Sequence, residues 1–241
     1  MLAWVTIMKN QFKGRHFSAE IILFCLRWYL QSPLSYQPVA DLVTERGFRI
    51  NKTTVWRWVQ CYAPKLKHKL RKYLKFSTAV HHYDETYIKV RGKLRYLYRA
   101  IDSNGNTLDF VLTVRKDKSS AIQFLRRVLS QDHVTSPGTI VTDKNPSYSA
   151  AIRSLKEANM LKSNLRHVKH KRRNNILEAD HRFVKRRIKY SLWFQEFHSA
   201  QQTIAGYESM HMIRKGQMRY VGKNDPVSQK RFVENLFGAV A

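Results

Sequence analysis

The sequence predicts an all-α domain followed by an α/β domain with a mixed sheet. Two observations predict this division: apolar residues recur at helical spacing up to about residue 75, and from Thr78 onward they alternate with a period of two. A third observation concerns partners. The chain carries 44 Lys and Arg residues against 17 Asp and Glu residues, a net charge of +27, and nucleic-acid phosphate is the commonest partner of so basic a protein. A solvated basic surface is the alternative.

Three helices are expected in the all-α domain. Ser18 and Ser35 stand where a side-chain oxygen can cap the first and second helices. The third helix is expected to begin at Lys52 and to stop at about Tyr62, because Pro64 lacks the N–H that an interior helical residue donates. A basic connector follows the third helix.

A helix, a short turn containing glycine and a second helix form the helix-turn-helix arrangement, in which the later helix enters the major groove of DNA. On the wheel of the third helix, hydroxyl, guanidinium and amide side chains lie opposite the apolar face, and such groups reach base edges and phosphates. The expected DNA-binding residues are Thr53, Thr54, Arg57 and Gln60. Trp56 and Trp58 are expected to pack internally. An ordinary three-helix bundle with a polar outside is the alternative interpretation.

The α/β domain is predicted to begin with three strands joined by tight turns, an antiparallel meander over 81–90, 94–102 and 107–114. The elements expected after it are a helix over about 119–130, a strand over 138–143, a helix over 146–159, a weaker strand over 164–168, and helices from 176 and over 201–212. This order predicts a mixed sheet with helices on both faces. It matches the ribonuclease-H-like fold.

Because acidic residues are few in so basic a chain, a carboxylate at the end of a predicted strand is a candidate for the active site. Asp84 lies within the first predicted strand, and Asp143 ends the strand over 138–143. If these strands are neighbours, the two carboxylates face each other and can hold a pair of divalent cations for phosphoryl chemistry. Each acid alone has a structural interpretation, since Asp before a turn is most often a cap. Glu85, Asp102 and Asp109 are expected to be structural strand acids.

A third acid is expected from the helix that starts near residue 176. On its wheel Glu178 lies outside the apolar arc, at the rim of a cleft, with Lys185 within about 20° of it two turns along. Asp180 points into the apolar arc and is expected to make a buried hydrogen bond or a cap. Lys185 can hold a DNA phosphate, and a solvated lysine is its alternative interpretation.

Several classes of chemistry lack support in the sequence. Cys25 and Cys61 form no CxxC pair, so neither a disulfide framework nor a zinc site is expected. Oxygen ligands alone favour Mg²⁺, with Mn²⁺ able to substitute. There is no phosphate-binding GxxxxGK[ST] loop, so no nucleotide cofactor is expected. We find neither a secretory signal nor an apolar run long enough for a membrane span, and expect a cytoplasmic protein without a membrane partner.

Four segments together resemble a known family. They are DETYIKVRGKLRYLYRAID, TDKNPSY, NNILEADHRFVKRR and GYESMHMIRKGQ. They are similar to the successive signatures of the "insertion sequence six" family of bacterial insertion-sequence transposases, which are DDE transposases with a retroviral-integrase-like core. The interval between Asp143 and Glu178 is typical of that family. The resemblance runs from about residue 8 to 217.

The resemblance implies a set of roles. Asp84, Asp143 and Glu178 would be the metal-binding triad for two Mg²⁺ ions, and Lys185 the basic residue on the helix of the glutamate. The implied function is binding of the terminal inverted repeats of an insertion sequence, metal-dependent 3′-end cleavage and strand transfer into target DNA. The implied route is replicative, with cointegrate formation. The implied partner, besides double-stranded DNA, is a second copy or more of the same chain.

The expected organisation is an N-terminal extension over 1–16, a helix-turn-helix domain with its basic connector over 17–75, a catalytic domain over 76–220 and a tail over 221–241. The sequence is also compatible with two rival functions. A helix-turn-helix regulator would bind DNA without needing the acids. A related metal-dependent nuclease or integrase would use the same acids.

Overall fold

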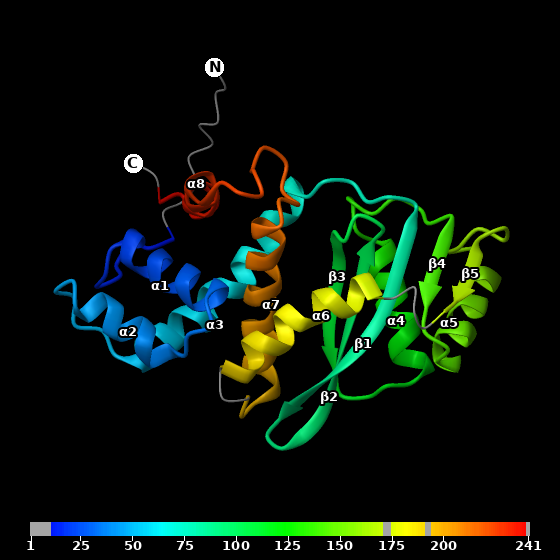
Figure 1. The fold of residues 1–241 in the computed structure, drawn as a ribbon, viewed down its shortest axis with the longest axis horizontal. Helices are drawn as coiled ribbons and strands as arrows, with labels where there is room; N and C mark the ends of the chain where they lie inside the picture. The colour runs from blue at the N-terminus through cyan, green and yellow to red at the C-terminus, as the bar shows by residue number, and fades with distance from the viewer. Residues whose placement is uncertain (1–10, 171–174, 191–193, 240–241) are drawn as a thin grey trace. The chain divides into compact units, whose positions relative to one another are not determined.

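The structure is a computed structural model that describes residues 11–170, 175–190 and 194–239 (Figure 1). The chain forms two compact units. One consists of Met1–Tyr73 together with Gln202–Ala241, and the other of Leu74–Gln201. We call them the helical unit and the sheet unit. Among the described helices, none is both long enough and apolar enough to cross a bilayer.

The N-terminal part of the helical unit contains the three predicted helices. They are α1 (Ala19–Gln31), α2 (Tyr36–Thr44) and α3 (Lys52–Leu70), followed by the short 3₁₀ helix η1 (Arg71–Tyr73). Ser18 caps α1 by accepting a hydrogen bond from the backbone N of Ile21 at 3.4 Å. Asn51 caps α3 by accepting one from the backbone N of Thr54 at 2.9 Å. Ser35 occupies the cap position of α2 without a side-chain hydrogen bond.

The predicted end of the third helix is wrong, because α3 runs through Pro64 to Leu70. Proline at position 64 removes one hydrogen bond from the helix, at a cost of about 3 kcal/mol. Tyr62, Leu66 and Leu70 are fully buried on one face of the helix. Burial of each such side chain contributes about 1.5–3 kcal/mol, so the apolar face outweighs the lost hydrogen bond.

The C-terminal residues fold with the N-terminal helices, which differs from the expected boundaries at 76–220 and 221–241. Helix α7 (Phe197–Arg214) enters the helical unit at Gln202, and α8 (Pro226–Phe237) follows. Tyr207 on α7 donates a hydrogen bond to the hydroxyl of Tyr29 on α1 at 2.8 Å. A Cβ on Gly206 would lie 2.5 Å from Leu30 Cδ2 and 2.7 Å from Ala63 Cβ, so α7 packs closely against α1 and α3.

The sheet unit has one five-stranded mixed sheet. Its strands are β1 (Val80–Val90), β2 (Lys93–Asp102), β3 (Thr107–Thr113), β4 (Thr139–Thr142) and β5 (Arg166–Lys169). Their order is β3-β2-β1-β4-β5. The first three pair antiparallel, whereas β4 and β5 run parallel to β1. The predicted meander and strand over 138–143 are therefore confirmed.

Helices cover both faces of this sheet. Helices α4 (Lys118–Leu129) and α5 (Pro146–Glu157) pack over a buried core that includes Tyr83, Tyr98 and Phe124. Helix α6 (Asn175–Tyr190) contacts β1 and crosses on the other side of the sheet from α4 and α5 (Figure 1). A mixed sheet with helices on both faces confirms the predicted α/β, ribonuclease-H-like class.

Gly206→Ala is expected to destabilise the helical unit. The added methyl group would overlap the rigid Cβ of Ala63, and such overpacking costs about 1–3 kcal/mol. The higher helix propensity of alanine offsets at most about 1 kcal/mol of this overpacking cost. The unfolding temperature measured by calorimetry should therefore fall. Gly138→Ala is the control, because the nearest atom to its Cβ is Ala79 O at 4.0 Å. Equal unfolding temperatures for the two variants would contradict the close packing.

Candidate active site

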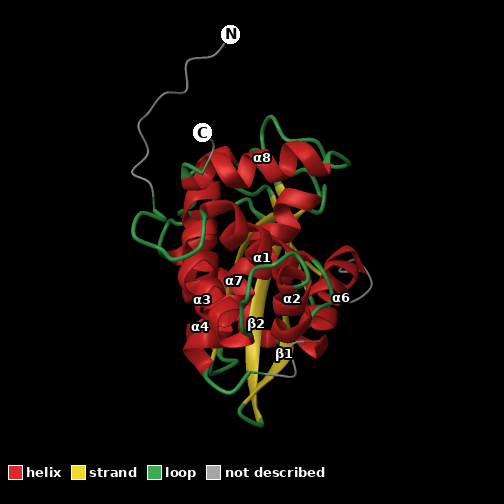
Figure 2. Cartoon of the chain, turned by 90° about the vertical axis from the view of Figure 1, so that its left-hand side faces the viewer, coloured by secondary structure: helices red, strands yellow, loops and turns green. Residues whose placement is uncertain are grey.

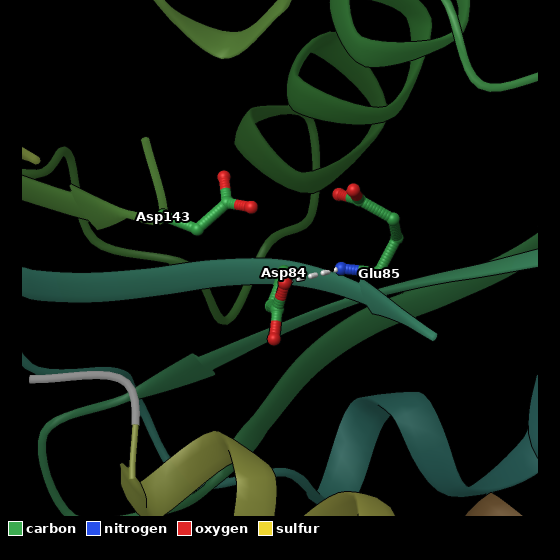
Figure 3. A group of neighbouring side chains, drawn as sticks. All are labelled: Asp84, Glu85 and Asp143. Atoms are coloured by element: carbon green, nitrogen blue, oxygen red, sulfur yellow. Dashed lines mark hydrogen bonds between the residues drawn. The ribbon is translucent and has the colours of Figure 1, made fainter. Parts of the chain in front are cut away.

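Three carboxylates gather where β1 passes the end of β4. One carboxylate oxygen from each of Asp84, Glu85 and Asp143 lies within 4.8 Å of the others. The register explains this, because His82 pairs with Val141 in the parallel β1–β4 ladder and both strands continue in the same direction. In Figure 3 Glu85 and Asp143 point to one side of β1, and Asp84 points to the other. Asp84 and Asp143 therefore lie close together, as expected from neighbouring strands, but their carboxylates point to opposite sides of β1 and do not face each other as expected.

Asp84 and Asp143 are each held by one backbone hydrogen bond. Asp84 Oδ1 accepts from the backbone N of Glu85, and Asp143 Oδ1 accepts from the backbone N of Asn145, both at 2.9 Å. Each carboxylate keeps a second oxygen for a ligand. Burial, followed by the negative charge of Glu85, raises the pKa of Asp84 to about 7. The cluster thus has too little positive charge nearby, and a bound divalent cation would supply it.

Glu85 was expected to be a structural acid, and the structure brings it into the cluster instead. Its side chain is only 1% exposed and forms an ion pair with Lys116, which lies just before α4. Asn145 Nδ2 donates to Glu85 Oε1 at 3.2 Å. The alternation along β1 indicates only that Glu85 and Asp84 lie on opposite faces. No signal in the sequence links Lys116 or Asn145 to Glu85, since that contact depends on where the two loops fold. Asp102 and Asp109 are structural, as expected.

Asp102 and Asp109 are bonded to other residues of the sheet unit. Asp102 accepts hydrogen bonds from the backbone N of Thr78, Asn104 and Asn106 at 3.1, 3.0 and 2.8 Å. Asp109 pairs with Arg127 Nε at 2.7 Å. Both carboxylates therefore hold the sheet and its turns together and leave no oxygen for the cluster.

Helix α6 brings further ionisable groups to the Asp84 side of the sheet. Asp180 forms an ion pair with the buried Arg99 of β2, which confirms the expectation of a buried hydrogen bond. His181 Nδ1 lies 4.0 Å from Asp84 Oδ2. Burial, then the charge of Arg99, lowers the pKa of His181 to about 3. The imidazole is therefore neutral at pH 7 and does not compensate the charge of Asp84.

Glu178 and Lys185 are the other two predicted site residues on α6. Glu178 belongs to α6, one turn before His181, and its side chain lies outside the described residues. Lys185 is exposed, one turn after His181, and its positive charge contributes to lowering the pKa of His181. The structure thus places Lys185 on the side of α6 that carries His181.

On α3 the predicted DNA-binding residues separate into two groups. Thr53 and Arg57 are exposed, whereas Thr54 is half-buried and bonded to the Asn51 cap. Gln60 is half-buried, and its Nε2 donates to Thr203 Oγ1 on α7 at 2.9 Å. Trp58 is buried as expected. The expectation for Trp56 is wrong, because its side chain is 41% exposed next to Arg57.

Asp84→Asn is expected to stabilise the metal-free chain at about pH 8 and to have little effect at about pH 4. Folding raises the pKa of Asp84 from its ordinary 3.8 to about 7. The folded state therefore binds more protons than the unfolded state between these values, and wild-type stability falls as the pH rises through them. In a chain of this size, one kcal/mol of unfolding free energy corresponds to roughly 2–4 °C in unfolding temperature. In EDTA at about pH 8, the unfolding temperature of Asp84→Asn should therefore exceed that of the wild type by several degrees.

The control for this substitution is Asp132→Asn, which removes an exposed carboxylate. Its unfolding temperature should follow that of the wild type at every pH. Added Mn²⁺ should raise the unfolding temperature of the wild type more than that of Asp84→Asn. Parallel pH profiles for Asp84→Asn and the wild type would show that the carboxylate cluster carries no uncompensated charge.

Comparison with known protein families gives a match over this part of the chain. Residues 78–217 match a family described as a DDE domain. The chain is 37% identical over 217 residues to the transposase for insertion sequence-like element IS431mec of Staphylococcus aureus, which covers 87% of this chain and 91% of the relative. It is 36% identical, over the same shares, to the transposase for insertion sequence element IS257 in transposon Tn4003 of Staphylococcus aureus.

Solved structures of low sequence identity also align. The catalytic core domain of HTLV-2 integrase in complex with magnesium is 14% identical, covers 58% of this chain and 88% of its own, and gives a TM-score of 0.43. The catalytic core domain of BIV integrase is 13% identical, covers 66% of this chain and 96% of its own, and gives a TM-score of 0.44. Family membership rests on the sequence matches. On those, the chain belongs to the DDE transposases of the insertion sequence six family, a class of polynucleotidyl transferase.

Proposed function

We propose that this transposase binds the terminal inverted repeats of an insertion sequence, cleaves their 3′ ends and transfers them into target DNA. The proposed route is replicative and forms a cointegrate. The observation that supports the chemistry is the approach of Asp84, Glu85 and Asp143 to within 4.8 Å. A regulator that only binds DNA has no use for a cluster of one buried and two half-buried carboxylates, because such a cluster destabilises the fold unless a cation is bound.

We propose Asp84, Asp143 and Glu178 as the residues that hold two Mg²⁺ ions, with Mn²⁺ able to substitute. Carboxylate oxygens are the ligands that these hard cations prefer, and the raised pKa of Asp84 fits a site that lacks positive charge. When bound, the ions supply an activated nucleophile and stabilise the leaving oxygen. Glu178 is included because α6, to which it belongs, brings His181 to 4.0 Å from Asp84.

Other residues of the chain keep the proposed ligands in place. The backbone N of Asn145 fixes one oxygen of Asp143, and the side chain of Asn145 contacts Glu85. Arg99 neutralises Asp180 and so ties α6 to β2 on the Asp84 side. Lys185 is proposed to hold a DNA phosphate, since an exposed ammonium on this side of α6 is free to reach the strand being cut. No covalent protein intermediate is needed.

Asp84→Asn, Asp143→Asn and Glu178→Gln are each expected to abolish cleavage and joining while terminal-repeat binding persists. Loss of one metal ligand removes several kcal/mol of transition-state stabilisation. The experiment incubates purified full-length protein with terminal-repeat DNA, a target plasmid and Mg²⁺, and separates joined from cut products on a gel. Products that are cut but never joined, even with the wild type, would favour the rival nuclease.

Matched controls are available for these changes. Asp132→Asn and Glu157→Gln remove exposed carboxylates elsewhere in the sheet unit, so joining should stay at the wild-type rate. A triad variant that still joins DNA would exclude that residue from the site. If Glu85→Gln also abolished joining, Glu85 would have to be added to the proposed ligands.

We propose that the first two turns of α3 contact the terminal repeats through Thr53, Trp56 and Arg57. These residues share one exposed side of the helix, and a helix of this kind enters the major groove. A guanidinium reads guanine by two hydrogen bonds, and an aromatic ring contacts thymine methyl groups. Gln60 is left out because its amide is bonded to Thr203.

Arg57→Ala is expected to weaken terminal-repeat binding by about 1–3 kcal/mol if the guanidinium contacts a base. Binding of unrelated duplex should change less, as measured by fluorescence anisotropy on the full-length protein. Gln60→Ala is the matched comparison, and it should lower the unfolding temperature while leaving relative affinities unchanged. Equal losses on both DNAs for Arg57→Ala would assign Arg57 to phosphate. A selective loss for Gln60→Ala would contradict its role in packing.

We also propose that the active form is a dimer or larger assembly on DNA. Strand transfer of an element joins two ends to one target, and each end needs a set of carboxylates beside its scissile bond. One chain supplies one such set within its described residues.

A further inference from the structure

Strands β1 and β2 extend past the rest of the sheet as a two-stranded ribbon. The β1–β4 ladder covers only Val80 to His82 of β1, and the β2–β3 ladder reaches no further toward the turn than Tyr96 of β2. Beyond these points β1 and β2 pair with each other, with one bridge from Val90 to Phe194 along the described chain. Figures 1 and 2 both show this hairpin projecting past the ends of its neighbouring strands.

The ribbon ends in a tight turn at Arg91 and Gly92. Both residues have left-handed backbone angles, with φ of 49° and 72°. Two such residues in succession are typical of the type I′ turn, whose twist matches that of a hairpin. The turn holds Lys89, Arg91 and Lys93 close together, and all three are exposed.

The ribbon is strongly and uniformly basic. Residues 86–101 contain five Lys and Arg residues and no Asp or Glu. Arg99 pairs with Asp180, whereas Lys89, Arg91, Lys93 and Arg95 show no ion pair within the part of the chain that the structure describes. Like charges concentrated on a projecting element repel one another unless an anion lies against them.

One face of the ribbon continues from the carboxylate cluster. Side chains alternate along a strand, so Glu85, Tyr87 and Lys89 share a face. Leu94 pairs with Lys89 across the ribbon. Lys116, the partner of Glu85, has its Nζ 5.7 Å from the centroid of the Tyr87 ring. Tyr87 and Leu94 are 53% and 50% exposed, so this face presents apolar surface between positive charges.

We propose that these ribbon residues form a second surface for duplex DNA, which holds the backbone beside the strand that is cut or joined. The surface, here named the ribbon patch, consists of Tyr87, Lys89 and Leu94 on that face together with Arg91 and Lys93 at the turn. The proposal rests on the proposed function and adds a contact outside α3. A two-stranded β-ribbon fits the major groove. At roughly 3.4 Å per residue the patch reaches about 20 Å from Glu85, the length of about six base pairs.

Charge complementarity favours DNA over a second copy of the chain. Two ribbons placed face to face would bring the same positive charges together on proteins that each carry a net charge of +27. Duplex phosphate supplies the opposite charge at short, regular spacing. Tyrosine and leucine beside the basic groups can contact sugars and thymine methyl groups. Self-association through the ribbon is the outcome that would overturn the proposal.

The test compares two double variants of equal charge. Lys89→Gln with Arg91→Gln alters the ribbon patch, and Lys118→Gln with Arg126→Gln alters exposed residues of α4. Affinity is measured in EDTA against salt concentration, separately for terminal-repeat and for unrelated duplex. The ribbon variant should reduce the slope of log affinity against log salt by about 2, and the α4 variant should leave it unchanged. The duplex that loses slope identifies which DNA lies on the ribbon.

Each outcome decides the proposal. Unchanged slopes on both duplexes, or a change of oligomeric state in sedimentation without a change of slope, overturn it. If the ribbon variant unfolds, Lys93→Gln alone in the exposed turn should reduce the slope by about 1. Because binding is measured in EDTA, failure of the proposed catalysis does not affect the result. If the wild type joins DNA and the ribbon variant keeps the wild-type slope of log affinity against log salt, the ribbon surface is overturned and the proposed function stands.

Discussion

The candidate active site depends on the register of the short parallel ladder between β1 and β4. That ladder spans three residue pairs, from Val80 with Thr139 to His82 with Val141, yet it fixes which side chains meet just beyond it. Asp143 follows β4 directly, and Asp84 continues along β1. A slip of one residue would move Asp84 to the face of α4 and α5 and bring Glu85 to the face of α6. The helices on both faces suppress such a slip, because Tyr83 would then leave the core that contains Phe124 and Tyr148.

The charges around this ladder are arranged unevenly. On the α6 side, Arg99 is bonded to Asp180, and His181 is neutral, so Asp84 receives no close compensating charge from either. On the α4 side, Lys116 is bonded to Glu85. The unfolded chain would hydrate all of these carboxylates freely, so gathering them lowers the stability of the fold unless a cation is bound. The excess of basic over acidic residues in the chain, 44 against 17, does not remove this local deficit, because charges beyond about 10 Å are screened by salt.

The sequence predicts periodic elements and local caps well, and predicts long-range side-chain contacts poorly. The strands of the meander and the Ser18 cap follow from patterns within a few residues, and the structure confirms them. Pro64 misled the prediction of α3 because local propensity was outweighed by burial of Leu66 and Leu70. The contacts of Gln60 and Glu85 could not be predicted for one shared reason: their partners, Thr203 and Lys116, are distant in sequence. A helical wheel identifies a polar face without showing which part of it another helix covers.

The same limit applies to the domain boundaries, and it changes how the proposed DNA recognition can be studied. A stretch over 17–75 contains every helix of the helix-turn-helix pattern, and it lacks α7 and α8. In the structure Tyr207 donates a hydrogen bond to Tyr29, Leu30 and Ala63 lie against Gly206, and the rings of Tyr62 and Phe237 meet edge to face with centroids 5.8 Å apart. Cutting the chain at 75 would expose these apolar surfaces at about 25 cal/mol for each Å². The helical unit is therefore built from both ends of the chain, and α3, the proposed recognition helix, depends on residues that follow the sheet unit in sequence.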